Sequence, residues 1–246
     1  LILVVEDKME LRRFIIENLG SEYRYAEAEN GKIGIEVAEK LMPDLIISDV
    51  MMPELDGLEM CGYLKNNRAT SHIPLILLTA KADEIDKLIG LETGANDYLT
   101  KPFSLAEIRL RVKNMLHLRT VLHKNYEGNQ IPRPDNANVL NKKDTEFLEI
   151  MNQTIQANLS SQLFGATELS EQMFLSVSQF NRKIKSITGI TTATYIRNYK
   201  LQKAVEMLME GRQVAETAWE IGFGDPVYFS KVFKKHFGYP PSEVKK

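Results

Sequence analysis

The sequence predicts a parallel α/β domain followed by an all-α domain. Three observations support this prediction. Over residues 1–119, five short apolar runs alternate with stretches of helical periodicity, which is typical of a parallel sheet with helices on both faces. Residues 120–143 lack this alternation, contain Gly, Pro and several Asn, and are predicted to form a linker. From residue 144 onward helical patterns dominate and strand patterns are absent. We therefore expect domains at 1–119 and 144–246.

The elements of the first domain follow one another in strand–helix order. Strands are predicted at 1–5, 23–28, 45–48, 75–79 and 97–100, where apolar runs have strand length. Helices are predicted near 9–19, 31–41, 57–66, 84–93 and 104–119, where apolar residues recur at helical spacing. Asp56 and Gly57 provide turn chemistry after the third strand.

The second domain is predicted to contain only helices. They lie near 144–159, 166–173, 177–187, 192–210, 213–222 and 225–237, and a short turn follows Pro240 and Pro241. The segments 166–187 and 213–237 each consist of a short helix, a tight turn and a longer basic helix. This weak internal repeat indicates two helix-turn-helix units.

Composition and charge narrow the class of protein. The chain has 246 residues, of which 43% are apolar and 26% charged, and this composition is that of a globular protein. No apolar run approaches the roughly 20 residues of a membrane span, so we expect no membrane contact within this fragment. The single cysteine, Cys61, cannot form an internal disulfide, which fits a reducing, cytoplasmic location and a buried thiol.

The net charge of −2 conceals an asymmetry between the two ends of the chain. Residues 1–119 hold 15 basic and 20 acidic residues, a net charge of −5. Residues 177–246 hold 12 basic and 6 acidic residues, a net charge of +6. An acidic first part and a basic last part indicate different partners, and nucleic acid is the natural partner of the basic part.

Reactive side chains are expected where the strands end, because parallel sheets bind ligands beyond the carboxyl ends of their strands. Asp49 ends the third run and is the candidate nucleophile, since a carboxylate oxygen can attack phosphorus. Glu6 and Asp7 follow the first run, and three carboxylates together favour a hard cation such as Mg²⁺. Thr79 and Lys101 would supply a hydroxyl and an ammonium group for phosphate oxygens.

Each of these residues also has an ordinary structural explanation. An acidic pair after a strand commonly caps a helix, and an aspartate that ends a strand is commonly a turn residue. Their joint occurrence at successive strand ends favours phosphoryl transfer over these separate explanations.

Four motifs resemble the receiver domain of two-component response regulators. They are Leu-Ile-Leu-Val-Val-Glu6-Asp7, Asp49-Val-Met-Met-Pro-x-x-Asp-Gly57, Leu-Leu-Thr79-Ala-Lys and Gly94-Ala-x-Asp-Tyr98-Leu-Thr-Lys101-Pro-Phe. The resemblance covers about residues 1–119. It implies a flavodoxin-like fold with a five-stranded parallel sheet in the order 2-1-3-4-5, and phosphorylation of Asp49 by a histidine kinase.

The same resemblance implies roles for individual residues. Asp7, Asp49 and the backbone carbonyl of Met51 would bind Mg²⁺, with Glu6 acting through water. Thr79 and Tyr98 would form a switch pair, in which the aromatic ring follows the hydroxyl inward on phosphorylation. The bond between Lys101 and Pro102 is expected to be cis.

The two basic helices of the second domain have distinct faces. Phe180, Ile184 and Ile187 in the first, and Phe229, Val232, Phe233 and Phe237 in the second, are expected to face the core. The residues left for base edges and phosphates are Ser178, Gln179, Asn181, Arg182 and Lys185 in the first helix, and Pro226, Val227, Tyr228, Lys231, Lys234 and Lys235 in the second. A single such helix could be an ordinary solvated basic face, whereas two favour DNA.

The helix between them would be roughly 28 Å long at ~1.5 Å per residue. With its flanking turns it could hold two reading helices about one DNA turn apart, ~34 Å. The run from Gly222 to Glu243 resembles the second helix-turn-helix of AraC-type regulators, and the run beginning Thr192-Ala-Thr-Tyr resembles their connecting helix. This resemblance covers about residues 144–246 and implies a double-stranded DNA operator, with RNA polymerase as a candidate partner.

The leading interpretation is a DNA-binding transcription regulator, an activator by family pattern, that is controlled by phosphorylation of Asp49 and forms a homodimer on phosphorylation. It is not expected to be an enzyme beyond its own phosphorylation and dephosphorylation. The alternative is a phosphotransfer relay or phosphate sink whose C-terminal domain mediates protein interaction. Because the sequence begins at Leu1 in a strand pattern, a third arrangement is the cytoplasmic end of a membrane-anchored hybrid sensor with its kinase in the same chain.

Overall fold

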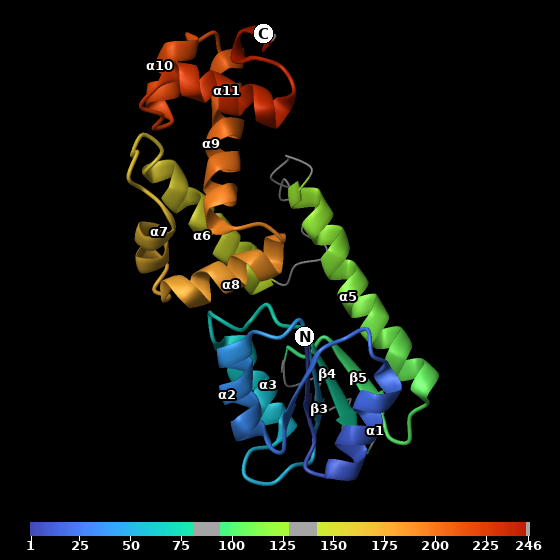
Figure 1. Ribbon diagram of the computed structural model, residues 1–246. Coiled ribbons are helices and arrows are strands. Elements are labelled where there is room, and N and C mark those ends of the chain that lie inside the picture. Colours follow the sequence, from blue (N-terminus) through green and yellow to red (C-terminus); the bar gives the residue numbers. More distant parts are fainter. Residues whose placement is uncertain (81–93, 128–141, 245–246) are drawn as a thin grey trace. The chain divides into compact units, whose positions relative to one another are not determined.

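The computed structural model describes residues 1–80, 94–127 and 142–244 (Figure 1). The chain divides into two compact units, Leu1–Thr120 and Val121–Lys246. The helix predicted at 84–93 lies outside the described residues. No helix in the described ranges combines the length and apolar character needed to cross a membrane.

The first unit is built on the predicted five-stranded parallel sheet. Its strands are β1 (Ile2–Val5), β2 (Tyr25–Ala28), β3 (Leu45–Asp49), β4 (Leu75–Thr79) and β5 (Asp97–Thr100). They pair in the order β2-β1-β3-β4-β5, all parallel, which confirms the predicted order. The three central strands are fully buried, which explains why their sequences are continuous apolar runs instead of alternating ones.

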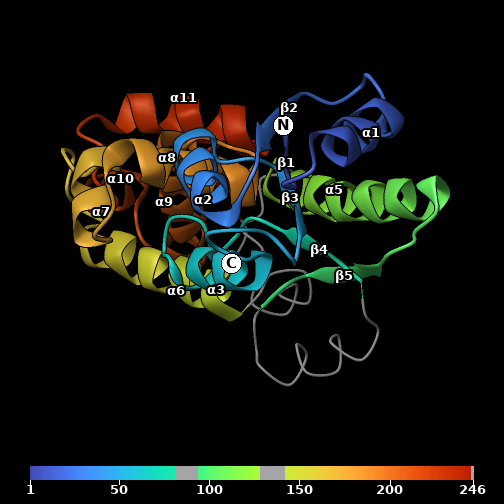
Figure 2. The same cartoon turned by 90° about the horizontal axis from the view of Figure 1, so that it is seen from below.

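Helices cover both faces of this sheet (Figures 1 and 2). On one face, α1 (Met9–Leu19) and α5 (Leu105–Glu127) contribute Ile15, Leu19, Ile108 and Val112 to a core with alternate strand residues such as Ile2 and Val4. On the other face lie α2 (Gly31–Leu41) and α3 (Gly57–Asn66). A Cβ atom at Gly34 would lie 2.6 Å from the Met60 sulfur and 3.2 Å from Val5, so glycine permits the close packing of α2.

The second unit contains the predicted helices and a final short turn. These are α6 (Lys142–Ala157), α7 (Ala166–Gln172), α8 (Val177–Thr188), α9 (Thr192–Met209), α10 (Val214–Glu220), α11 (Pro226–Phe237) and η2 (Pro241–Glu243). The longer helices α8 and α11 begin at side-chain caps: Ser176 accepts from the N–H of Gln179, and Asp225 accepts from the N–H of Val227 at 2.8 Å. Both end at a glycine with positive φ, Gly189 and Gly238.

Helix α9 links two apolar cores within this unit. Its first half contributes Tyr195 and Ile196 to a core shared with α6, α7 and α8. Its second half contributes Leu201, Ala204 and Leu208 to a core shared with α10 and α11. With 18 residues, α9 is about 27 Å long at ~1.5 Å per residue.

The helix predicted at 104–119 extends further than expected, although the two compact units divide after Thr120, next to the predicted end of the first domain. Helix α5 was expected to end at 119 but continues to Glu127. The first helix breaker after it is Gly128, and Tyr126 is 5% exposed, packed in the core with Phe147 and 6.1 Å from the Tyr195 ring. This buried anchor favours helix where the sequence shows no clear apolar period. Helix α6 likewise begins at Lys142, two residues before its predicted start.

Candidate functional site

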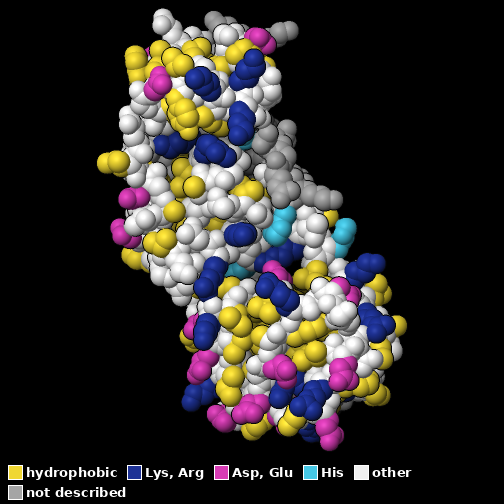
Figure 3. Space-filling model, in the orientation of Figure 1, with side chains coloured by type: hydrophobic (Ala, Val, Ile, Leu, Met, Phe, Trp, Pro, Cys, Tyr) yellow, Lys and Arg dark blue, Asp and Glu magenta, His cyan; other side chains and the backbone are white. Residues whose placement is uncertain are grey.

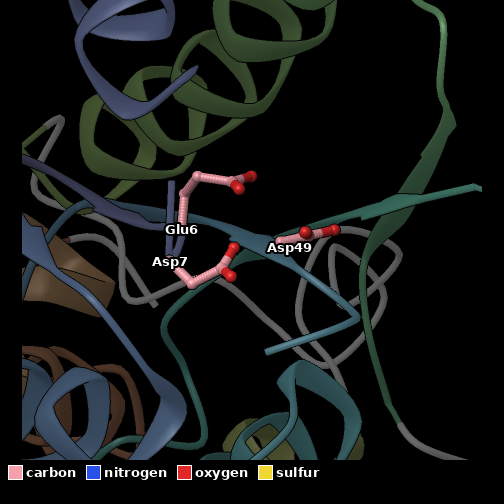
Figure 4. Close-up of side chains that lie close together, drawn as sticks. All are labelled: Glu6, Asp7 and Asp49. Atoms are coloured by element: carbon pink, nitrogen blue, oxygen red, sulfur yellow. The ribbon is translucent and has the colours of Figure 1, made fainter. Parts of the chain in front are cut away.

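Three carboxylates meet at the carboxyl ends of β1 and β3. Glu6 and Asp7 directly follow β1, and Asp49 is the last residue of β3. Because β1 and β3 are adjacent, with Val5 opposite Ser48, the two strand ends coincide. Each of the three residues offers an oxygen within 4.8 Å of the others. Figure 4 shows the three side chains gathered at these strand ends.

Lys101 neutralises part of this negative charge. Its Nζ lies 2.9 Å from Asp49 Oδ2 and 3.1 Å from Glu6 Oε2. The N–H of Val50 donates to Asp49 Oδ1 at 2.8 Å. Burial of Glu6, and secondarily the nearby charge of Asp49, raises the pKa of Glu6, while Lys101 opposes this shift. Two of the three carboxylates, Glu6 and Asp49, thus share the positive charge of Lys101.

Gly57 and Asp56 bring α3 close to Asp49. A Cβ atom at Gly57 would lie 2.0 Å from the carbonyl oxygen of Asp49, so no other residue fits without movement of the backbone. The Asp56 side chain accepts from the N–H groups of Leu58 and Glu59 at 2.8 Å and caps α3. The predicted turn residues thus allow a close contact between β3 and α3.

The carboxylate cluster fits a magnesium ion. Mg²⁺ prefers oxygen ligands and keeps several waters, so it needs an open side as well as carboxylates. Glu6 is fully buried and Asp49 is 7% exposed, but Asp7 is exposed and leaves such a side. Asp7 and Asp49 would hold the ion, which when bound would neutralise charge and orient a phosphoryl group. The carbonyl of Met51 stays a predicted ligand.

The predicted switch residues lie on the two neighbouring strands. Thr79 is the last residue of β4 and is fully buried, and Tyr98 lies half-buried in β5. The N–H of Lys101 donates to the carbonyl of Thr79 at 2.6 Å, which ties the lysine to the same edge of the sheet. The bond between Lys101 and Pro102 is cis, as expected.

Helix α8 presents the first predicted DNA-facing set. Its core residues Phe180, Ile184 and Ile187 are buried, which confirms the predicted face. The exposed members of the set are Ser178, Arg182 and Lys185. Gln179 and Asn181 are half-buried and already serve the fold: Gln179 Oε1 accepts from the N–H of Ser176, and Asn181 Oδ1 accepts from the hydroxyl of Thr192 at 2.6 Å.

Helix α11 presents the second set. Phe229 and Phe233 are fully buried, whereas Val232 and Phe237 are half-buried at the edge of the same core. Pro226 is half-buried, and the exposed residues are Val227, Tyr228, Lys231, Lys234 and Lys235. Figure 3 shows dark blue Lys and Arg side chains among yellow hydrophobic ones over the region that α9 and α11 occupy in Figure 1.

Sequence reasoning missed two cations of this unit. Lys183 in α8 is 1% exposed, and its Nζ lies 3.2 Å from Asp144 Oδ1 in α6. Its position three residues after Phe180 was a signal for the buried face, but its charge indicated the surface. Arg197 in α9 lines a depression with residues of α11, and no local pattern in the sequence indicated that contact.

The fold and the acidic cluster define a receiver-class domain joined to a helical domain with two helix-turn-helix units. Comparisons with known proteins agree. The profile of the response regulator receiver domain matches residues 2–113, and that of a helix-turn-helix domain matches residues 169–246. The chain therefore consists of a response regulator receiver domain and an AraC-type helix-turn-helix domain.

Individual relatives match over different lengths. "Histidine kinase P4" of Formosa agariphila is 37% identical over 98% of this chain, which corresponds to 18% of that protein. "Alkaline phosphatase synthesis transcriptional regulatory protein PhoP" of Bacillus subtilis is 45% identical over 47% of this chain and 48% of its own length. The crystal structure of the receiver domain of a signal transduction histidine kinase from Syntrophus aciditrophicus is 39% identical, with a TM-score of 0.43, over 47% of this chain and 89% of that one. The chain thus spans less than half the length of either curated relative.

Proposed function

We propose that this chain is a phosphorylation-controlled, sequence-specific DNA-binding regulator of transcription, in which Asp49 accepts a phosphoryl group from a histidine kinase. The observation that carries the proposal is a combination of two features. One unit holds a carboxylate cluster in which Asp49 pairs with Lys101, and the other unit holds two basic helix-turn-helix units. The regulator from Bacillus subtilis, named for transcriptional regulation, supports the same assignment for the first unit.

The geometry suggests how phosphoryl transfer proceeds. An oxygen of Asp49 attacks the phosphorus of phosphohistidine, so that a P–O bond forms while the P–N bond breaks and its electron pair returns to the imidazole. Lys101, now 2.9 Å from Asp49, would move its ammonium group onto a phosphoryl oxygen. Thr79 would turn its hydroxyl toward another oxygen, and Tyr98 would follow inward and change the surface of the unit. That surface change would favour a homodimer, operator binding and contact with RNA polymerase.

Phosphorylation of Asp49 can be tested with acetyl phosphate and Mg²⁺. The full chain should gain the mass of one phosphoryl group, whereas Asp49→Asn should gain none. Asp44→Asn is the matched control, because Asp44 directly precedes the same strand at its opposite end and pairs instead with the N-terminal amine and Arg119. Continued labelling of Asp49→Asn would refute the assignment.

DNA binding is tested by sequencing genomic fragments bound by the chain with and without acetyl phosphate. The bound fragments should share a sequence, and their enrichment should increase on phosphorylation. Binding should also decrease steeply with salt concentration, because contacts to DNA phosphates release counterions. Phosphate uptake without any salt-dependent DNA binding would instead support the phosphotransfer relay, with the second unit as a protein-interaction module.

We further propose that the chain is part of a hybrid histidine kinase that acts in the cytoplasm. The supporting observation is that the relative from Formosa agariphila, named as a histidine kinase, aligns with 98% of this chain, so that the match covers both units. The kinase would then phosphorylate Asp49 within one polypeptide. Phosphate transfer from the full-length protein to Asp49, measured at increasing dilution, should keep a constant rate if donor and acceptor share a chain.

A further inference from the structure

A depression in the second unit gathers positive charge from two helices. Its walls are formed by Arg197 of α9 and by Tyr228, Lys231, Val232, Lys235 and His236 of α11. Its volume is about 460 Å³, and none of the described residues that line it is acidic. Arg197 was not part of either predicted DNA-facing set.

The three cations of this depression, Arg197, Lys231 and Lys235, are exposed. Among the described residues, the ion pairs of this unit use other cations, such as Lys183, Lys203 and Arg212. Like charges held together repel one another, and the repulsion is relieved when an anion binds between them. The depression therefore has the charge of an anion site.

Backbone geometry explains why Arg197 reaches this place. Its chain neighbours Ile196 and Asn198 are buried, whereas Arg197 itself is exposed, so the guanidinium lies at the surface of α9. Lys231 and Lys235 are four residues apart and therefore lie on one face of α11. The planar guanidinium of arginine can donate two parallel hydrogen bonds to a phosphate, and the Tyr228 hydroxyl is a further donor.

We propose that this pocket binds one phosphate of the DNA backbone, and that Arg197 is a DNA contact from the connecting helix. The inference rests on the proposed DNA-binding function and deepens it. Because every nucleotide carries the same phosphate, this contact positions α11 on the duplex and adds affinity without reading sequence. Val227 at the start of α11 lies outside the pocket and remains available for base edges.

The test measures binding of the full chain to a random-sequence duplex of about 40 base pairs, long enough for two half-sites one turn apart. Fluorescence anisotropy of the labelled duplex is recorded over a salt series. Arg197→Ala should weaken binding about fivefold near ~0.1 M salt and reduce the salt slope by about 0.9. Arg197→Lys should keep most of the slope but lose part of the affinity. Lys203→Ala is the matched control, because it removes the same charge from the same helix but lies outside the pocket.

The outcomes separate the two proposals. If the wild-type chain binds no duplex, the DNA-binding function fails and this inference fails with it. If the wild type binds and Arg197→Ala matches Lys203→Ala in affinity and slope, only the phosphate pocket is refuted. A free phosphate ion could fill the same pocket in place of a backbone phosphate of DNA. Titration of the chain with inorganic phosphate in the absence of DNA tests for this occupant. Saturable binding that Arg197→Ala abolishes, together with unchanged DNA binding, would assign the pocket to a free phosphate and overturn the proposal.

Discussion

Loss of the Asp144 carboxylate should destabilise the second unit strongly. Asp144 and Lys183 form an ion pair of 3.2 Å with side chains that are only 3% and 1% exposed. The ammonium group also lies 4.4 Å from the centre of the Phe147 ring. The pair joins α6 to α8, so it fixes how the first basic helix is rotated and which side chains it presents outward.

The expected loss of stability follows from the burial of the Lys183 side chain. Removing one partner of a buried pair leaves an uncompensated charge and costs about 3–5 kcal/mol. A domain is stable by roughly 5–15 kcal/mol, so Asp144→Ala should remove a large fraction of that stability. Replacing both residues by apolar ones of similar size, as in Asp144→Leu with Lys183→Met, should recover most of the loss, because no buried charge remains.

The only tryptophan of the chain, Trp219 in α10, makes the measurement specific to this unit. Urea unfolding followed by its fluorescence gives the free energy, and hydrogen exchange of the α8 amides checks that both cores unfold together. Lys142→Ala is the control, because its ammonium group lies 3.9 Å from Glu146 and is 90% exposed, so its loss should change stability by about 0.5 kcal/mol or less. A loss below about 1 kcal/mol for Asp144→Ala, or a double variant no more stable than the single one, would refute the reasoning.

Three further predictions concern the first unit. The raised pKa of Glu6 means that its ionised form opposes folding, so without metal the stability falls as pH rises from 4.5 through the folded pKa. Glu6→Gln should therefore raise the Tm of this unit at neutral pH without Mg²⁺ and reduce the further gain from added Mg²⁺; a lower Tm without metal would contradict this sign. Burial raises the pKa of the Cys61 thiol to about 11. Iodoacetamide at pH 8 should accordingly modify native Cys61 at least ~100-fold more slowly than the urea-unfolded chain, and comparable rates would show that the thiol is accessible. Gly57→Ala should lower the Tm and slow phosphorylation by acetyl phosphate, because its Cβ would lie 2.0 Å from the Asp49 carbonyl oxygen, whereas Gly62→Ala, which would meet no atom within 4 Å, should be tolerated.

Much of the fold was predictable from local patterns. The central strands are buried on both faces, so their sequences must be continuous apolar runs, and their predicted ends agree with the structure to within a residue. The helix predicted at 57–66 has the same bounds because Asp56 and Gly57 mark its start. The end of α5 was missed because Tyr126 is buried in a core of the second unit and its ring contacts that of Tyr195, which local sequence cannot reveal.

The candidate site was also predictable from the sequence only in part. Parallel pairing alone brings Glu6, Asp7 and Asp49 to one edge of the sheet, so their meeting follows from the order of the strands. The sequence could not indicate that Lys101 contacts both Glu6 and Asp49, or that Glu6 is fully buried while Asp7 is exposed. Those features depend on the packing of side chains that surround the cluster.

The sequence by itself determined the two-domain order, the parallel sheet, the strand-end carboxylates and the buried faces of the two basic helices. It could do so because periodicity and turn chemistry act between residues close along the chain. Only the tertiary structure decided that Lys183 is a buried partner of Asp144 and that Arg197 joins Lys231 and Lys235 around one depression. These contacts join residues 34–39 positions apart, and their energies depend on distance and burial, which no local pattern records.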